Sequence, residues 1–333
     1  MPFVRTPDER FADLAGFPYQ PHYVVVSGLR MAYEDEGPRD GEIVLLLHGE
    51  PSWSYLYRKM IPLLAGAGYR VIAADMMGMG RSDKPVQFKE YSYLKHVQWV
   101  EQFIDQLGLR NATAFVQDWG SLIGLRVVGD HPDLFARVVV ANGRLPVIPE
   151  GLKLVTFPDP PLPNDQLTLP FNSCNEAAIV VPHIGVSECF AEWAVYALTG
   201  TAFRPSEVVE ELTTITLSTQ ERIAYDAPFP SRIYMTGARV FPSLINTLGE
   251  APNNAVARKV FDNWTKPLLT LFGRLDNSLG SDAVQAEMRD RVPGAKGQAH
   301  YAYADAKHFV QEDKGDDLAR RVIDFMVANP SRP

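Results

Sequence analysis

The chain of 333 residues has 46% hydrophobic, 11% aromatic and 22% charged side chains, a globular composition that excludes disordered, collagen-like and coiled-coil proteins. Its formal net charge of −8 comes from 40 acidic and 32 basic residues and argues against a nucleic-acid partner. Cys174 and Cys189 are the only cysteines, and neither a signal peptide nor an apolar run of about 18 residues is visible, so we expect a cytoplasmic protein with two free thiols and no membrane partner.

The first half of the chain alternates strand and helix patterns. We predict strands at His22–Ser27, Met31–Tyr33, Glu42–Leu47, Arg70–Ala74, Ala112–Val116 and Val138–Ala141, with helices at Trp53–Leu64, Tyr91–Leu107 and Leu122–Val128. The continuous apolar run of Glu42–Leu47 is typical of a strand that is buried on both faces. The alternation predicts right-handed crossovers and a mostly parallel sheet, with helices on both faces.

The pattern changes at Pro146, where a proline-rich segment excludes a long helix or a central strand. Helix patterns follow at Glu188–Leu198 and Pro205–Leu212. Strands at Leu268–Phe272 and Ala299–Tyr303 then alternate with helices near Ile233–Leu248, Ala255–Trp264, Asp282–Arg291 and Asp316–Val327. We therefore predict an eight-stranded core domain of residues 1–145 and 231–333, with residues 146–230 inserted after the sixth strand as a helical cap.

The stretch Val116-Gln117-Asp118-Trp119-Gly120 ends an apolar strand and begins a helix, which is the setting of a nucleophile elbow. An elbow raises one side chain above the sheet and aims the N–H of the next residue at the same space. Here the raised residue is Asp118, so the serine-based mechanism of esterases and lipases does not fit. Taken alone, Asp118 could also be a helix cap.

Three other loops offer partners for an aspartate nucleophile. Glu50, in His48-Gly49-Glu50-Pro51 after the third strand, is placed to supply a backbone N–H to an oxyanion hole. His308 follows the last strand and is the one of seven histidines in the position of a base. Asp276 follows the seventh strand and could orient that base or form an Asx turn. The chain order Asp118, Asp276, His308 is that of an α/β-hydrolase fold.

The chain resembles the haloalkane dehalogenases over nearly its whole length. The matching segments are HGEPSWSYLYRKMIP (His48–Pro62), GRSDKP (Gly80–Pro85), VQDWGSLIGLR (Val116–Arg126), YDAPFP (Tyr225–Pro230) and HFVQED (His308–Asp313). HGEP together with QDWG is the specific pair, because epoxide hydrolases share the elbow alone. Glu50 and an acid after the seventh strand resemble the branch that has an Asp–His–Asp triad and two halide-binding tryptophans.

This resemblance implies hydrolysis of a haloalkane to an alcohol, a halide ion and a proton, without a cofactor or a metal. Asp118 would displace the halide and form an alkyl-enzyme ester. His308, oriented by Asp276, would then activate the water that hydrolyses the ester. The N–H groups of Glu50 and Trp119 would hold the oxyanion.

The departing halide needs donors in an apolar pocket, which indole N–H groups can supply. Trp119 is expected to be one donor. Trp193, the only tryptophan in the predicted cap, is expected to be the second, because a carboxylate at Glu50 would repel a halide; Trp193 also fits a core position. Phe190 precedes Trp193 by three residues and is expected to line the substrate pocket. The proline-rich segment 147–171 looks longer than is usual for the family.

Two alternative functions remain open from the sequence. An epoxide hydrolase would use the same elbow and ester, with two cap tyrosines to protonate the epoxide oxygen, and Tyr196 and Tyr225 are available. A relative of the same fold that only binds a ligand is the second alternative, since a fold does not determine a function.

Overall fold

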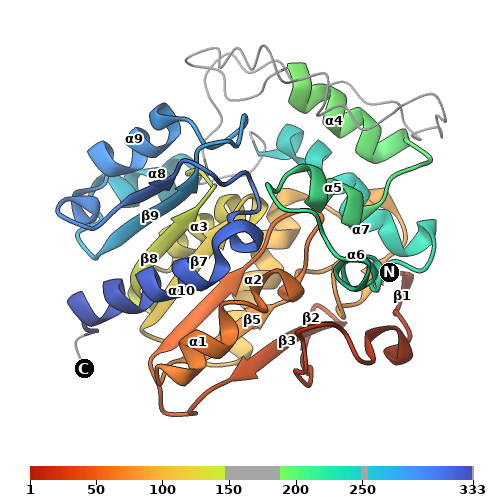
Figure 1. The fold of residues 1–333 in the computed structure, drawn as a ribbon, viewed down its shortest axis with the longest axis horizontal. Helices are drawn as coiled ribbons and strands as arrows, with labels where there is room; N and C mark the ends of the chain where they lie inside the picture. Colours follow the sequence, from red (N-terminus) through yellow and green to blue (C-terminus); the bar gives the residue numbers. More distant parts are fainter. Residues whose placement is uncertain (147–187, 249–253, 332–333) are drawn as a thin grey trace.

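The computed structural model describes residues 1–146, 188–248 and 254–331. A central twisted sheet has α1 and α10 on one face and α2 and α3 on the other, while α4 lies above the rest of the molecule (Figure 1). The proline-rich segment 147–171, Cys174 and the side chain of Cys189 lie outside what is described. Among the described helices, none is both long enough and apolar enough to cross a membrane, and the cytoplasmic location stays a prediction.

The main sheet has eight strands. Their spatial order is β10 (Tyr301–Tyr303), β9 (Leu268–Gly273), β8 (Phe135–Ala141), β7 (Ala112–Gln117), β4 (Ile43–Leu47), β5 (Arg70–Ala74), β3 (Leu29–Glu36) and β2 (His22–Val26). The strands from β10 to β5 are parallel, and β3 is antiparallel to both of its neighbours. A small antiparallel pair joins β1 (Phe3–Val4) to β6 (Lys84–Pro85). The predicted mostly parallel sheet is confirmed.

The described helices follow the strands in the expected alternation. The α-helices are α1 (Ile61–Gly66), α2 (Tyr93–Gln106), α3 (Trp119–Asp130), α4 (Glu188–Thr199), α5 (Pro205–Glu211), α6 (Thr219–Asp226), α7 (Thr236–Val240), α8 (Asn254–Asp262), α9 (Asp282–Arg291) and α10 (Val310–Ala328). The 3-10 helices are η1 (Asp8–Phe11), η2 (Ser54–Tyr57), η3 (Phe88–Glu90), η4 (Pro132–Leu134), η6 (Arg232–Met235), η7 (Phe241–Thr247) and η8 (Pro293–Ala295).

Alternate residues of the central strands fill two separate hydrophobic cores, because successive side chains of a strand point to opposite faces. On β4, Leu45 and Leu47 belong to the core beneath α2 and α3, whereas Val44 and Leu46 belong to the core beneath α1 and α10. Leu47 lies beside Val116, so β4 and β7 end at the same edge of the sheet. The loops that carry Glu50 and Asp118 therefore start side by side.

Three predicted helices differ from those observed. The stretch Trp53–Leu64 is divided into η2 and α1, because Pro62 is tolerated only in the first turn of a helix. The stretch Ile233–Leu248 is likewise divided into η6, α7 and η7, and η7 has a proline in its first turn. The last helix begins at Val310 rather than Asp316, with a kink at Lys314 (φ −139°, ψ 24°).

Helix α6 was not predicted. It starts with a capping box, in which the Ser218 hydroxyl accepts from the N–H of Glu221 and the Glu221 carboxylate accepts from the N–H of Ser218. Only Ala224 and Tyr225 of this helix are buried, so its sequence has too narrow an apolar stripe to stand out. The capping box was the available signal.

Candidate active site

Asp118 lies at the sharp turn between β7 and α3. Its backbone, at φ +50° and ψ −127°, is in a region that non-glycine residues rarely adopt. The backbone N–H donates to the carbonyl oxygen of Asn142, 3.0 Å away, just after β8. Asp118 occupies the N-cap position of α3, but its side chain makes no capping hydrogen bond to the helix, so the carboxylate remains available for other partners.

Two glycines provide the space that this turn requires. A Cβ atom on Gly49 would lie 2.2 Å from Oδ1 of Asp118, and one on Gly120 would lie 2.1 Å from the carbonyl oxygen of Leu47. Both distances are far below a van der Waals contact. A side chain at either position would displace the aspartate or the start of α3.

Glu50 contacts Asp118 through its main chain. Its N–H donates to Oδ1 of Asp118 at 2.9 Å, so this donor is aimed at the carboxylate from the side of β4. The Glu50 side chain is buried, and its Oε1 has no hydrogen-bond partner among the described residues. Burial, followed by the negative charge of Asp118, raises the pKa of Glu50 well above its usual value. A carboxyl group held neutral does not repel an anion, so the charge argument against Glu50 as a neighbour of a halide loses force.

His308 lies between two carboxylates. Its Nδ1 is 2.8 Å from Oδ2 of Asp276, and its Nε2 is 3.4 Å from Oδ2 of Asp118. His308 and Asp276 are both buried, each with 6% of its surface exposed. Three residues from loops after three different strands are thus brought together in the predicted arrangement.

The charges of Asp118, Asp276 and His308 shift the pKa values of His308 and Asp276. Burial lowers the pKa of His308, but the Asp276 carboxylate and then Asp118 outweigh it and raise that pKa to about 10. Burial likewise raises the pKa of Asp276, but the charge of His308 and its hydrogen bond hold the pKa below the usual value. The arrangement therefore stabilises a positive imidazolium between two negative groups while Asp118 is ionised.

Asp276 both forms an Asx turn and faces His308. Its Oδ1 accepts from the N–H groups of Ser278 at 2.8 Å and Leu279 at 3.1 Å, which is the turn that the sequence allowed. Its Oδ2 accepts from Nδ2 of Asn142 at 2.8 Å, in addition to facing the histidine. Because both oxygens of Asp276 are engaged in this way, the hydrogen bonds fix the orientation of its carboxylate.

Sequence reasoning missed two amides in this region. Asn142 is not among the residues predicted from the sequence, yet its Nδ2 donates to Asp276 and its Oδ1 accepts from the N–H of Gly273. Gln117 is fully buried, with its Nε2 3.0 Å from Nε2 of His308. The sequence signal that could have pointed to them is their position at the ends of β8 and β7, the edge of the sheet at which the site was predicted.

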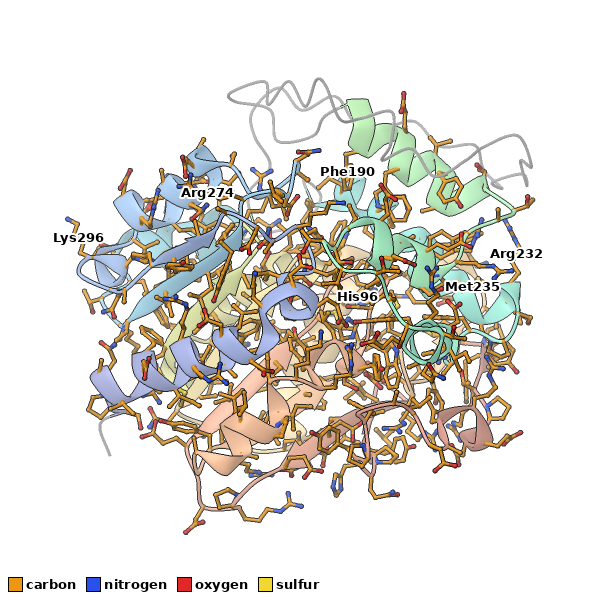
Figure 2. All side chains as sticks on the ribbon, in the orientation of Figure 1. His96, Phe190, Arg232, Met235, Arg274 and Lys296 are labelled. Atoms are coloured by element: carbon orange, nitrogen blue, oxygen red, sulfur yellow. The ribbon has the colours of Figure 1, made fainter. Side chains whose placement is uncertain are left out.

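The expected halide-binding tryptophans belong to one hydrophobic core. Trp119 is buried at the start of α3 and packs edge-on against Phe241, with ring centroids 5.3 Å apart. Within the described part of the chain, no residue accepts a hydrogen bond from its indole N–H. Trp193, on α4, is buried and stacks on Phe203 at 5.9 Å. Phe190 precedes it on α4, packs against the same core and is partly exposed (Figure 2).

The tyrosines that an epoxide hydrolase would need are otherwise engaged. The Tyr225 hydroxyl donates to Glu312, inside a largely buried polar group that we call the Arg58 cluster: Arg58, Lys59, Glu221, Tyr225 and Glu312. Arg58 donates to Glu312 Oε2 at 2.8 Å and to Glu221 Oε1 at 2.6 Å. Tyr196 packs against Trp193 and Phe203. With Tyr225 bound to Glu312, this pair does not favour epoxide chemistry.

Among the described residues, no group of three or more His, Cys, Asp or Glu side chains is arranged to hold a metal ion. The expectation that the chemistry needs no cofactor stays a prediction.

Comparisons with known proteins agree on one family. A family model described as the α/β hydrolase fold matches residues 42–171. A haloalkane dehalogenase of Psychrobacter cryohalolentis is 42% identical over 339 residues, covering 99% of this chain and 100% of that protein. One of Mycobacterium marinum is 43% identical over 333 residues, covering 98% and 100%. The tetrameric structure of haloalkane dehalogenase DpaA from Paraglaciecola agarilytica is 32% identical, with a TM-score of 0.79, covering 96% of this chain and 97% of that one.

Proposed function

Because the chain belongs to the haloalkane dehalogenase family, which has the α/β-hydrolase fold, we propose that it converts a haloalkane and water to an alcohol, a halide ion and a proton through an ester on Asp118. The observation that carries this proposal is the contact of one carboxylate with two groups. Asp118 accepts from the Glu50 N–H through Oδ1 and faces Nε2 of His308 with Oδ2.

In the first half of the reaction, Asp118 attacks the carbon that bears the halogen. A carboxylate oxygen forms the new C–O bond while the C–X bond breaks in line and the halide leaves with the electron pair. No base is needed, because a carboxylate is already anionic at neutral pH. The indole N–H groups of Trp119 and Trp193 stabilise the halide in a pocket that Phe190 lines, and the open donor of Trp119 supports its part.

In the second half, His308 takes a proton from water, and the hydroxide adds to Cγ of Asp118. The N–H groups of Glu50 and Trp119 stabilise the oxyanion, each donor being worth about 2.7–4 kcal/mol. Collapse releases the alcohol with the proton from His308. The carboxylic acid left on Asp118 then ionises, so one proton is released per turnover. Asp276 stabilises the imidazolium throughout.

We also propose that residues 146–230 form a cap domain on the core of 1–145 and 231–333. Support comes from α4, which packs on α7 and η7 and carries both Phe190 and Trp193. The cap would then exclude water from the halide site and decide which haloalkanes fit.

The first experiment measures halide release from 1,2-dibromoethane and 1-bromobutane by the purified protein, with Asp118→Ala as the control. We expect release that is lost in the variant. In His308→Phe the first half-reaction should proceed and the second should stop, so mass spectrometry should find the alkyl ester on Asp118. No release and no adduct would contradict the proposal; an epoxide panel would then test the related enzyme class.

A further inference from the structure

Gln117 is the last residue of β7, directly before Asp118, and is fully buried. Strand alternation points it to the same face as Phe115, toward the core that contains Phe309 at the start of α10. A buried amide costs free energy unless its polar atoms are paired. The partners of Gln117 therefore indicate what holds it there.

Both partners of the Gln117 amide nitrogen belong to His308. Nε2 of Gln117 lies 3.0 Å from Nε2 of His308 and 3.4 Å from the His308 carbonyl oxygen. A carbonyl oxygen can only accept, so it favours the amide orientation with nitrogen toward His308. The Gln117 oxygen is buried without a partner among the described residues.

A donor opposite Nε2 of His308 requires a lone pair on that atom. The neutral ring has one when its proton is on Nδ1, and Nδ1 faces the carboxylate of Asp276 at 2.8 Å. An imidazolium would instead direct its own Nε2–H at the N–H of Gln117. A hydrogen bond to the neutral form disfavours the charged form.

We propose that Gln117 is a positioning residue for the hydrolytic half of the reaction: its amide N–H holds His308 in the neutral tautomer whose Nε2 can take a proton from water. This inference rests on the function proposed above. It assigns Gln117 no contact with the substrate and no covalent step.

The charges around His308 determine when this hydrogen bond matters. The carboxylates that act on the ring are Asp276 after β9 and Asp118 after β7, while Glu50 after β4 faces the same group with its carboxyl held neutral by burial. While Asp118 is ionised, the imidazolium is favoured. Alkylation converts Asp118 into a neutral ester and removes one negative charge, so burial and the N–H of Gln117 then favour the neutral ring. Gln117 thus acts at the step in which His308 must be a base.

The experiment compares the full-length protein with Gln117→Met, which has a similar size but no donor, and with Gln117→Glu, which has the same shape and an acceptor instead. Rapid-quench assays with 1-bromobutane give the rate of the bromide burst, which reports alkylation, and the rate of ester hydrolysis, each as a function of pH. We expect the burst to change by less than about threefold. The acid limb of ester hydrolysis should move to higher pH by about one unit in Gln117→Met and further in Gln117→Glu, with the alkaline plateau retained.

Gln311→Met is the matched control. Gln311 is also fully buried and lies three residues after His308, but no hydrogen bond joins its amide to His308 in the described structure. Its replacement should leave the acid limb in place. Thermal unfolding measurements establish which variants are folded. If one of the two Gln117 variants does not fold, the other is sufficient for the test.

Two kinetic outcomes would overturn the inference. A lower plateau with an unmoved acid limb in the Gln117 variants would mean a merely structural role, and unchanged hydrolysis would mean no role. NMR titration of ¹⁵N-labelled His308 gives a readout that does not need turnover: its pKa should rise in Gln117→Met, and an unchanged pKa contradicts the inference. If the native protein gives neither burst nor halide release, the proposed function fails, and the titration still decides whether Gln117 holds the tautomer.

Discussion

At position 49 the main chain lies directly against the carboxylate of Asp118, the proposed nucleophile. In Gly49→Ala the new Cβ would lie 2.2 Å from Oδ1 and 2.3 Å from Cβ of Asp118, so the carboxylate must move. Misplacing a reacting group by about 1 Å costs about 100-fold in rate, and we expect a loss of halide release of that size. Gly66→Ala is the control, since its added Cβ would meet nothing within 4 Å beyond its chain neighbours and the backbone of its own helix. Equal activity of both variants would show that the turn adapts.

Glu50 predicts a pH dependence of stability. Its pKa is raised well above 4.5 in the folded chain, so the folded state holds the neutral acid while the unfolded chain ionises near pH 4.5. The contribution of Glu50 to the free energy of unfolding is therefore complete below about pH 4.5. It decreases by about 1.4 kcal/mol per pH unit as the pH rises toward the pKa of Glu50 in the folded protein. Glu50→Gln removes this dependence, so it should gain stability relative to the native protein between mildly acidic and alkaline pH. Urea unfolding at several pH values measures this, and parallel profiles would contradict it.

Residues that follow strands could be predicted from the sequence, whereas their supporting partners could not. Asp118, Asp276 and His308 each lie in the loop or turn that follows a recognisable strand, and their chemistry is visible in the residue type. Asn142 and Gln117 carry amides that have many possible roles. Their partners lie 134 and 191 residues away in the chain, so only the folded contacts show what they hold.

Among the elements, apolar runs predicted the strands well because a doubly covered sheet buries both faces of each strand. Arg70–Ala74 and Asp282–Arg291 have the predicted bounds. Helices with prolines or with narrow apolar stripes were predicted less well. The stretch around α7 is divided by Pro242, and α6 depends on polar capping and on Tyr225 rather than on a periodic apolar face.

Trp193 on helix α4 allows a test of the proposed second halide donor. Trp193→Phe keeps an aromatic ring but removes the indole N–H, and a hydrogen bond to a charged group contributes about 1.5–3 kcal/mol. We expect halide binding to weaken by at least about tenfold, measured by halide quenching of the remaining tryptophan fluorescence. Trp264→Phe is the control, because its indole N–H is buried after α8 without a partner in the described structure. Unchanged quenching in Trp193→Phe would place the donor elsewhere.

At the scale of the whole molecule, one end of β8 leads into the candidate site and the other end carries a side chain that we expect to stabilise the fold. β8 ends beside Asn142 at the site, while Arg137 near its start is buried. Arg137 donates to the Thr113 hydroxyl at 2.9 Å, to the Asn329 carbonyl oxygen at 2.6 Å and to Glu42. This one side chain joins the sheet to the end of α10.

Replacing Arg137 should therefore separate the two properties. In Arg137→Met the Thr113 hydroxyl is left buried without its donor, and we expect the free energy of unfolding to fall by about 2–4 kcal/mol. The halide-release rate per folded molecule should stay unchanged. Arg204→Met is the control, since its ion pair with Glu207 is exposed (67% and 47%) and such pairs contribute about 0–1 kcal/mol. A large loss of activity without a loss of stability would contradict the separation.

The Arg58 cluster has a consequence for modular engineering. Through Glu221 and Tyr225 it ties α6 to Arg58 and to Glu312, four residues after His308. A chimaera in which the corresponding segment of another protein replaces all of 146–230 would lose Glu221 and Tyr225. Arg58 and Glu312 would then lack these two native partners. A graft whose downstream junction precedes Ser218 keeps these native contacts, so the exchangeable segment is shorter than the proposed cap domain.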